Sequence, residues 1–380
     1  MRAVFGLLRN RSSIPRMLLG SRLLCLLVPA LAACASSPRR PAGDCPIPGA
    51  EPADELIEDG ERHFARLWRL TRDGENAEAY WSYDGRRLVL QRRNPAEGID
   101  CDRIFVTRDD SPGLVQVSSG RGATTCSYFL PGDQEILFAS TQGEMAACPH
   151  KPDYAQGYVW MLHPEFEIYA RELATGRERL LVGGPGYDAE ATLSRDGRHM
   201  VFTSTRSGDL ELWVGRSDGS GLRQVTDRPG YDGGAFFSHD GERLVFRSTV
   251  FDEGEEEQQL ADYRKLLKEW KIRPNKLEIF TCLRDGSERR QVTELGAASF
   301  APYFFPDDQR ILFASNHVAG GRNFDLYAVD AEGGPVERVT TYEGFDSFPM
   351  FSPCGRYLAF SSNRGGSEPG ETSVYVALWR

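Results

Sequence analysis

The chain has 380 residues, of which 40% are hydrophobic and 26% are charged, and it contains 39 glycines and 22 prolines. This balance is typical of a soluble globular protein, and the many Gly and Pro residues favour a fold rich in turns and strands. The formal net charge of −10 argues against a nucleic-acid-binding surface, because phosphate recognition depends on clustered Lys and Arg.

Residues 1–33 carry five arginines, no acidic residue and the apolar run LLCLLVPALAA, which together predict a signal peptide. The run is short for a membrane span. It ends in Leu31-Ala32-Ala33-Cys34, which resembles a bacterial lipobox, so we expect lipidation of Cys34; an ordinary cleavage site is the alternative. Ala35 resembles the pattern sorted to an outer membrane. Met17 would begin a more compact signal than Met1.

Residues 34–59 are rich in Pro and Ala and show no periodicity, so we expect a flexible tether between the lipid and the domain. These features predict a periplasmic protein that is anchored through its N-terminal lipid to the outer membrane.

One segment recurs along the chain, as GYDAEATLSRDGRHMVF (186–202), GYDGGAFFSHDGERLVF (230–246) and GFDSFPMFSPCGRYLAF (344–360). Each copy contains a two-residue turn between apolar runs, which predicts a β-hairpin. A third and a fourth strand follow, as in KLEIFTCLRDGSERRQVT. The turn occurs at six places: Asp84-Gly85, Gly132-Asp133, Asp196-Gly197, Asp240-Gly241, Asp307-Asp308 and Cys354-Gly355.

Six four-stranded antiparallel units at this spacing predict an all-β fold, a single six-bladed β-propeller over residues 60–380. The last unit ends after its third strand, at SVYVALWR. The segment around Leu67 to Thr71 aligns with the fourth strands of other units. We therefore expect an N-terminal strand to complete the last blade and close the ring, which removes exposed sheet edges.

The motifs FSHDGERLVF, LSRDGRHMVF and FSPCGRYLAF resemble the WD-like repeats of the TolB-type β-propeller family, over nearly all of the chain after the signal. Residues 35–60 are too short for the α/β domain that precedes the propeller in TolB. The resemblance implies a propeller-only relative with a periplasmic binding or scaffolding role. Cys354 and Gly132 depart from the usual Asp of the turn.

The loops that enter each first strand, and those between second and third strands, emerge on one side of the ring, which we call the loop face. Eight residues before each turn stands a polar residue, and two of these are followed by a glutamate two positions later. We expect them to line the channel mouth and bind a partner, with backbone capping as the alternative and a channel cation such as calcium as a third reading. The residues are Asn76, Glu78, Thr124, Asp188, Glu190, Asp232, Ser299 and Asp346.

Two insertions, 141–165 and 251–276, lie between second and third strands and should emerge on the loop face. The second has Leu260, Tyr263, Leu266, Leu267 and Trp270 at helical spacing, which predicts a helix that ends before Pro274. Its apolar stripe packs on the domain or docks a partner. The first is rich in residues suited to ligand or protein contact, or to covering the blade: His150, Tyr154, Tyr158, Trp160 and His163.

Cys101, Cys126 and Cys148 should all lie near the loop face of the first two blades. An oxidising compartment permits a disulfide there. We expect Cys126–Cys148, with a pair that includes Cys101 as the alternative. A site that binds metal through these cysteines and His150 matches no standard zinc spacing.

The sequence contains no nucleophile elbow, zinc-protease motif, phosphate loop or dinucleotide fingerprint, so we assign no catalytic residue, metal ligand or cofactor. The expected function is non-catalytic docking of a periplasmic protein, peptide or envelope polymer on the loop face. The alternative is an envelope hydrolase or lyase at the channel mouth. Its candidate residues would be Asp188, Glu190, Asp232, His150, His163 and His317.

Overall fold

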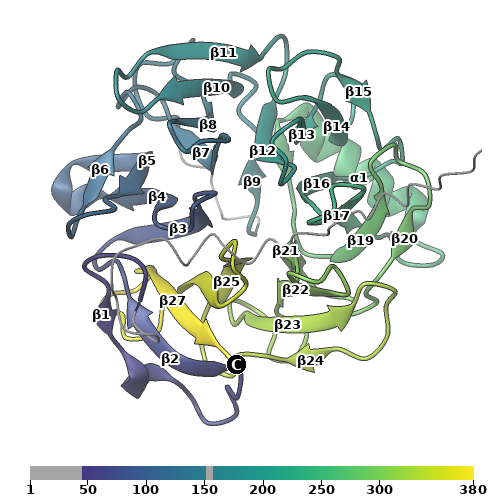
Figure 1. Ribbon diagram of the computed structural model, residues 1–380. Helices are drawn as coiled ribbons and strands as arrows, with labels where there is room; N and C mark the ends of the chain where they lie inside the picture. The colour runs from purple at the N-terminus through teal and green to yellow at the C-terminus, as the bar shows by residue number, and fades with distance from the viewer. Residues whose placement is uncertain (1–44, 151–156) are drawn as a thin grey trace, which may run out of the picture.

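The computed structural model describes residues 45–150 and 157–380, and in this part of the chain six small antiparallel sheets surround a central axis (Figure 1). The signal segment, Cys34 and Tyr154 lie outside the described residues. Blades one to three consist of β3 (Glu75–Trp81), β4 (Leu88–Asn94), β5 (Ile99–Thr107) and β6 (Leu114–Gln116); β7 (Thr124–Phe129), β8 (Glu135–Ser140), β10 (Glu167–Glu172) and β11 (Glu178–Val182); and β12 (Asp188–Leu193), β13 (His199–Ser204), β14 (Glu211–Arg216) and β15 (Arg223–Gln224).

Blades four to six repeat the same order, with the first strand of each nearest the axis. They consist of β16 (Asp232–Phe237), β17 (Arg243–Thr249), β19 (Leu277–Leu283) and β20 (Arg290–Gln291); β21 (Ser299–Phe304), β22 (Arg310–Ser315), β23 (Asp325–Asp330) and β24 (Glu337–Arg338); and β25 (Asp346–Phe351), β26 (Tyr357–Ser362), β27 (Ser373–Trp379) and β2 (Phe64–Arg69). The predicted six-bladed propeller is confirmed.

The N-terminal strand closes the ring, as expected: β2 pairs with β27 from Phe64↔Trp379 to Arg69↔Tyr375. In Figure 1 the purple and yellow ends of the chain meet in this blade. Arg364, which is 1% exposed, connects the two ends of the ring. Its guanidinium donates to both carboxylate oxygens of Glu61 at 2.9 Å and to Asp346 at 2.8 Å. Removing one partner of a buried charge pair of this kind is costly, so we expect Arg364 to support the closure.

The expectation of a flexible tether through residue 59 is wrong for residues 45–59. Ile47 and Ala53 are buried in the main core. Strand β1 (Glu51–Pro52) pairs with β2, and the 3₁₀ turn η1 (Asp54–Leu56) follows it. This segment folds because its few apolar residues cover the outer edge of blade six, a contact that a composition argument does not reveal.

Turn chemistry explains the repeated Ser-x-Asp-Gly signal. Ser238 Oγ donates to Asp240 at 2.6 Å and accepts from the Arg243 N–H at 2.9 Å, which closes the hairpin. In blades two and five, Asp133 and Asp308 take the left-handed position that glycine holds elsewhere, each with φ 59°. Both carboxylates accept backbone N–H groups from the preceding blade's turn, so these departures from the motif join neighbouring blades.

The two insertions join each other. Strand β9 (Trp160–Met161) of the first insertion pairs with β18 (Lys271–Ile272) of the second, which also contains the helix α1 (Glu256–Lys268). The remaining element, the 3₁₀ turn η2 (Pro95–Glu97), lies between β4 and β5 of blade one. Tyr263 of α1 is buried and donates its hydroxyl to Asp209, and Trp270 packs in the same cluster. The helical stripe therefore packs on the domain, which leaves the docking alternative without an open apolar face.

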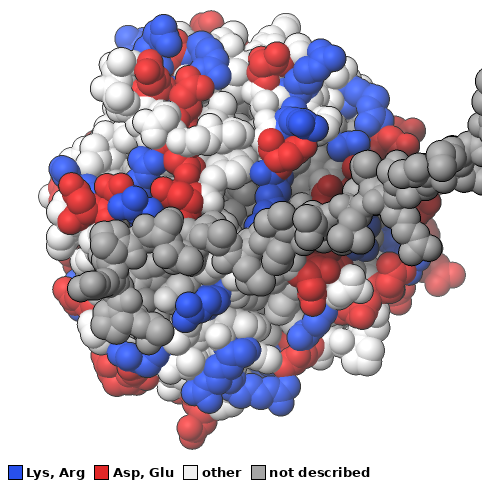
Figure 2. Space-filling view, viewed as in Figure 1, with Lys and Arg blue, Asp and Glu red and all other residues white. Residues whose placement is uncertain are grey.

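No helix in the part of the chain that the structure describes has the length and apolar character needed to cross a bilayer. Acidic and basic side chains alternate around the blades of the face in Figure 2.

Candidate binding site at the channel mouth

A β-bulge interrupts the first strand of every blade at one equivalent position. The residue at each bulge has a positive φ between 51° and 59°, which is uncommon outside glycine. Because the bulges recur around the axis, they form one ring near the loop-face end of the channel. Its members, in blade order, are Glu78, Cys126, Glu190, Gly234, Ala301 and Phe348.

The charged half of this ring is organised by Glu190. Arg247 of β17 forms an ion pair with it, and Tyr231 donates its hydroxyl to both carboxylate oxygens at 2.9 Å. The Gly234 N–H and the Thr203 hydroxyl add bonds of 2.9 and 2.6 Å. Glu190 is thus a fully engaged carboxylate that fixes the Arg247 guanidinium beside the axis.

Glu78 is the less engaged acid of the ring. Burial raises its pKa to about 7, and a hydrogen bond with Cys126 opposes that rise only in part. Burial, followed by the charges of Glu78 and Glu190, raises the pKa of the Cys126 thiol well above its usual value, so the thiol stays protonated. The pair can exchange hydrogen bonds with a ligand, but it does not present a thiolate nucleophile.

Trp160 connects the inserted cap to the ring. Its indole lies 5.0 Å from the Arg247 guanidinium carbon and packs edge-on against Tyr231 and Phe300, at centroid distances of 6.1 and 6.4 Å. The two insertions together therefore place one aromatic ring over the centre of blades four and five.

The other half of the mouth is aromatic. Phe300 contacts Phe324 at 5.0 Å and Phe348 at 5.7 Å, and Phe345 contacts both of these rings. Phe300 is buried, whereas Phe324, Phe345 and Phe348 are only partly buried. With Trp160 they form one continuous set of contacting rings, which we call the aromatic arc (Trp160, Phe300, Phe324, Phe345 and Phe348).

Six of the predicted mouth residues lie instead inside the sheets, so the expectation that they face a ligand is wrong. All are 3% exposed or less: Asn76, Thr124, Asp188, Asp232, Ser299 and Asp346. Asp188, Asp232 and Asp346 form ion pairs with Arg206, Arg289 and Arg364. The position opens each first strand, where backbone N–H groups such as those of Asp188 and Asp232 bond to the preceding blade, and the bulge two residues later faces the channel.

Glu78 and Glu190 therefore remain from the predicted set, and the structure adds Cys126, Arg247 and Tyr231. The sequence signal for Cys126 was present, since it stands two residues after Thr124, as Glu78 and Glu190 stand after Asn76 and Asp188. Arg247 has no such signal, because its approach to the axis depends on the bulge at Gly234.

The residues predicted as contacts in the first insertion do not gather at one site. Trp160 reaches the channel and donates its indole N–H to Tyr158 at 3.2 Å, while Tyr158 is 59% exposed. His163 lies beside Phe166, and His150 is exposed. His317 packs on Tyr327 at 4.3 Å. The ring contacts of His163 and His317 are thus made away from Glu78 and Glu190. Among the described residues, no group of three or more His, Cys, Asp or Glu could hold a metal ion.

The favoured disulfide Cys126–Cys148 is wrong, and the alternative with Cys101 is formed. Cys101 of β5 and Cys148 of the first insertion are bonded, with their Cα atoms 5.8 Å apart. The insertion leans toward blade one, where Arg103 also approaches the Cys148 sulfur. Cys126 cannot reach it, because the bulge turns its thiol toward the channel and Glu78.

No family model matches the chain. An uncharacterized protein of Agrobacterium fabrum is 36% identical over 174 residues, which are 39% of this chain. The Tol-Pal system protein TolB of Francisella tularensis is 28% identical over 92 residues, which are 24% of this chain. The matched regions span 57% and 20% of the length of these two curated relatives.

Among solved structures, TolB from Acinetobacter baumannii matches with a TM-score of 0.54 and 18% identity, over 77% of this chain and 64% of that one. A gluconolactonase from Xanthomonas campestris matches with a TM-score of 0.54 and 15% identity, over 90% and 99%. At these identities the likeness concerns the fold, and it agrees with the repeat motifs in the sequence. In its fold the chain is a six-bladed, TolB-like β-propeller.

Proposed function

We propose that the chain is a non-catalytic binding propeller, which docks a protein, peptide or envelope polymer on its loop face. The observation that carries this proposal is the aromatic arc. Partly buried aromatic rings in mutual contact, beside a fixed charged group, are the composition that protein interfaces favour at their centre.

The two halves of the mouth differ in polarity, so they would orient a docked segment. Apolar side chains of a partner would pack on Phe324, Phe345 and Phe348, which already lose part of their surface to one another. Polar groups would meet Glu78, whose carboxyl can donate as well as accept near neutral pH. The Arg247–Glu190 pair holds its geometry in the free protein, so little order would have to be gained on binding.

We also propose where in the cell the protein is located. The N-terminal arginines, apolar run and Cys34 favour a lipid-anchored periplasmic protein, and the Cys101–Cys148 disulfide suits an oxidising compartment. The name of one relative, a Tol-Pal system protein, supports a role in the cell envelope.

Site-specific photo-crosslinking in cells tests the docking proposal. Benzoylphenylalanine at position 345 should yield a discrete crosslinked species, whereas the same residue at Leu180, which is 53% exposed on the outer strand β11, should not. With the captured partner purified, the Phe324→Ser/Phe345→Ser double variant should bind at least about tenfold more weakly, which is about 1.4 kcal/mol. Equal crosslinking at both positions, or unchanged affinity in a folded double variant, would contradict the proposal.

A second candidate is an envelope hydrolase or lyase that uses Glu78 as acid or base, because a pKa of about 7 suits proton transfer at neutral pH. Against it, the histidines expected at such a site lie elsewhere, on Phe166 and Tyr327. Loss of a measured turnover in Glu78→Gln, with partner binding retained, would favour this candidate over docking.

A further inference from the structure

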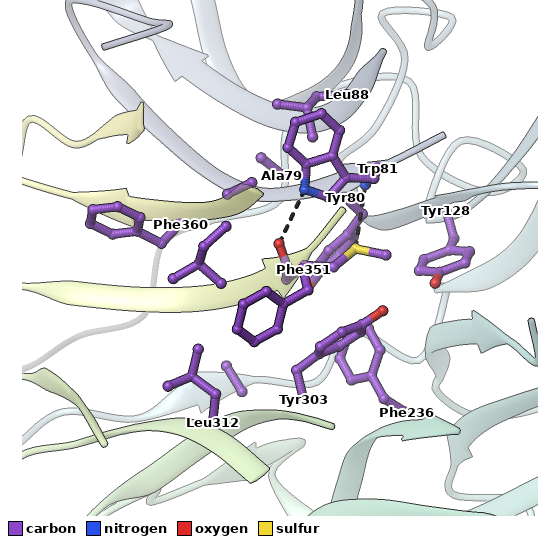
Figure 3. Close-up of a cluster of buried hydrophobic side chains, with 14 of the residues drawn as sticks. Ala79, Tyr80, Trp81, Leu88, Tyr128, Phe236, Tyr303, Leu312, Phe351 and Phe360 are labelled. Atoms are coloured by element: carbon purple, nitrogen blue, oxygen red, sulfur yellow. Dashed lines mark hydrogen bonds between the residues drawn. The ribbon is translucent and has the colours of Figure 1, made fainter. Parts of the chain in front are cut away.

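The opposite end of the channel, on the face that carries the Asp-Gly turns, holds a cavity of about 340 Å³. This volume lies in the range of small-molecule sites. Its wall is aromatic, with Trp81, Tyr83, Tyr128, Phe236 and Tyr303 among the lining residues. Figure 3 shows Tyr128, Tyr303 and Phe236 arranged around the open centre.

A layer of rings separates this cavity from the loop-face mouth. Tyr80 contacts Tyr128 at 5.9 Å and Phe236 at 5.5 Å, and Phe236 contacts Tyr303 at 5.3 Å. Trp81 is held in place because its indole N–H donates to the Met350 carbonyl at 3.1 Å (Figure 3). The cavity therefore has a preformed apolar floor, and a ligand there would not contact the Glu78 ring.

The polar side chains that line the cavity are neutral or basic: Ser82, Tyr83, Tyr128, Arg195, Ser238, His239 and Tyr303. None of the described residues that line it is Asp or Glu, although the whole chain carries a net charge of −10. The hydroxyls of Tyr128 and Tyr303 make no hydrogen bond to another described residue, and burial raises the pKa of both, so both keep their protons. Each can therefore donate to a ligand oxygen.

Arg195 supplies the cation. It is exposed at the rim, where one of its N–H groups donates to the Pro353 carbonyl at 3.2 Å. Its charge acts on both Tyr128 and Tyr303. The acids near the rim have hydrogen-bond partners of their own: Asp133 and Asp308 each bind two backbone N–H groups of a neighbouring turn, and Asp196 accepts from the Ser194 hydroxyl and the Arg198 N–H. They keep their negative charge, and that of Asp308 acts on Tyr303. Arg195 and the two tyrosine hydroxyls are the groups here that can attract an anion.

We propose that this turn-face cavity binds a small molecule that combines an apolar ring with a carboxylate. The ring would lie among Tyr128, Phe236 and Tyr303, and the carboxylate would bind Arg195. This site is independent of the docking proposed for the loop face.

Calorimetric titration of the protein with indole-3-acetate and with 3-methylindole, which lacks the carboxylate, tests the proposal. Indole-3-acetate should bind about tenfold more tightly or better. Arg195→Gln should remove that preference. Arg198→Gln is the matched control, because Arg198 belongs to the same turn, has a side chain that is 82% exposed and does not line the cavity.

Tyr303→Phe keeps the ring and removes one donor, so it should weaken indole-3-acetate binding by about threefold to tenfold while leaving 3-methylindole unaffected. The proposal is overturned if neither probe binds, if both bind equally well, or if Arg195→Gln and Arg198→Gln behave alike.

Discussion

Trp160 and Arg247 join two parts of the chain that are distant in sequence, with the guanidinium carbon 5.0 Å from the indole centroid. Trp160 belongs to the cap formed by the insertions, and Arg247 belongs to the strand β17 beside the channel. Because Arg247 is also ion-paired with Glu190, the cap is bound to a group that is already fixed. A desolvated cation–π contact of this kind stabilises by roughly 1–2 kcal/mol.

Trp160→Ala should therefore loosen the cap more than the ring. We expect the free energy of unfolding to fall by about 1–3 kcal/mol, through lost ring contacts with Arg247, Tyr231 and Phe300. Hydrogen exchange should accelerate in β9 and β18 and stay unchanged in β12. Trp160→Phe, which keeps a ring over Arg247, should retain most of the protection; uniform acceleration across all blades would argue against a separate cap.

Gly234 has to be glycine for a reason of space as well as of backbone. Its φ is 58°, and a Cβ there would overlap the guanidinium of Arg247. Gly234→Ala should therefore lower the free energy of unfolding by about 2–4 kcal/mol. One part of this loss comes from the left-handed backbone, and the other from the displacement of Arg247 away from Glu190.

Gly254→Ala separates the two causes. Gly254 has a φ of 83°, but a Cβ there would meet nothing within 4 Å. Gly254→Ala should therefore lower the free energy of unfolding by about 1 kcal/mol, through the effect on the backbone alone. Urea unfolding of both variants makes the comparison, and equal losses would show that the contact with Arg247 adds nothing.

The architecture could be predicted because it follows from local signals. The turn at Asp240-Gly241 and its equivalents repeats once per blade. The last blade lacks a fourth strand, so the segment near Leu67 can pair with the open edge of its third strand. The site was harder because a bulge changes which residue faces the axis. Counting from the turn selects Asp188, whereas the bulge brings Glu190 to the channel and leaves Asp188 buried against Arg206. The bulge stands two residues after the opening polar residue in every blade, but the sequence alone does not show that a bulge forms there and turns that residue toward the axis.

Glu78 predicts a pH dependence of stability. Its pKa is raised by burial from 4.5 to about 7, so between these pH values the folded protein binds more protons than the unfolded chain. Stability from this group is therefore fully present below about pH 4.5 and is lost as the pH rises through about 7. Glu78→Gln, which keeps a neutral side chain at every pH, should reduce the fall in urea midpoint between pH 5 and pH 8.

Glu144→Gln is the control for Glu78→Gln, since Glu144 is exposed in the first insertion. It should keep the slope of the unmodified protein. If Glu78→Gln also keeps that slope, Glu78 is ionised in the folded protein, and the enzyme alternative loses its proton donor.

Arg364 should be the most sensitive position of the ring closure. Arg364→Met leaves the buried carboxylates of Glu61 and Asp346 without their cation, which should cost about 3–5 kcal/mol. Arg206 is the matched control, because it stands two residues after the last serine of its strand, as Arg364 does, and pairs with the equivalent Asp188. Its side chain is 24% exposed and binds one carboxylate, so Arg206→Met should cost about 1–2 kcal/mol. Chemical unfolding ranks the two, and limited proteolysis before Phe64 should increase only in Arg364→Met. Equal losses would mean that closure depends on the β2–β27 pairing rather than on the buried charges.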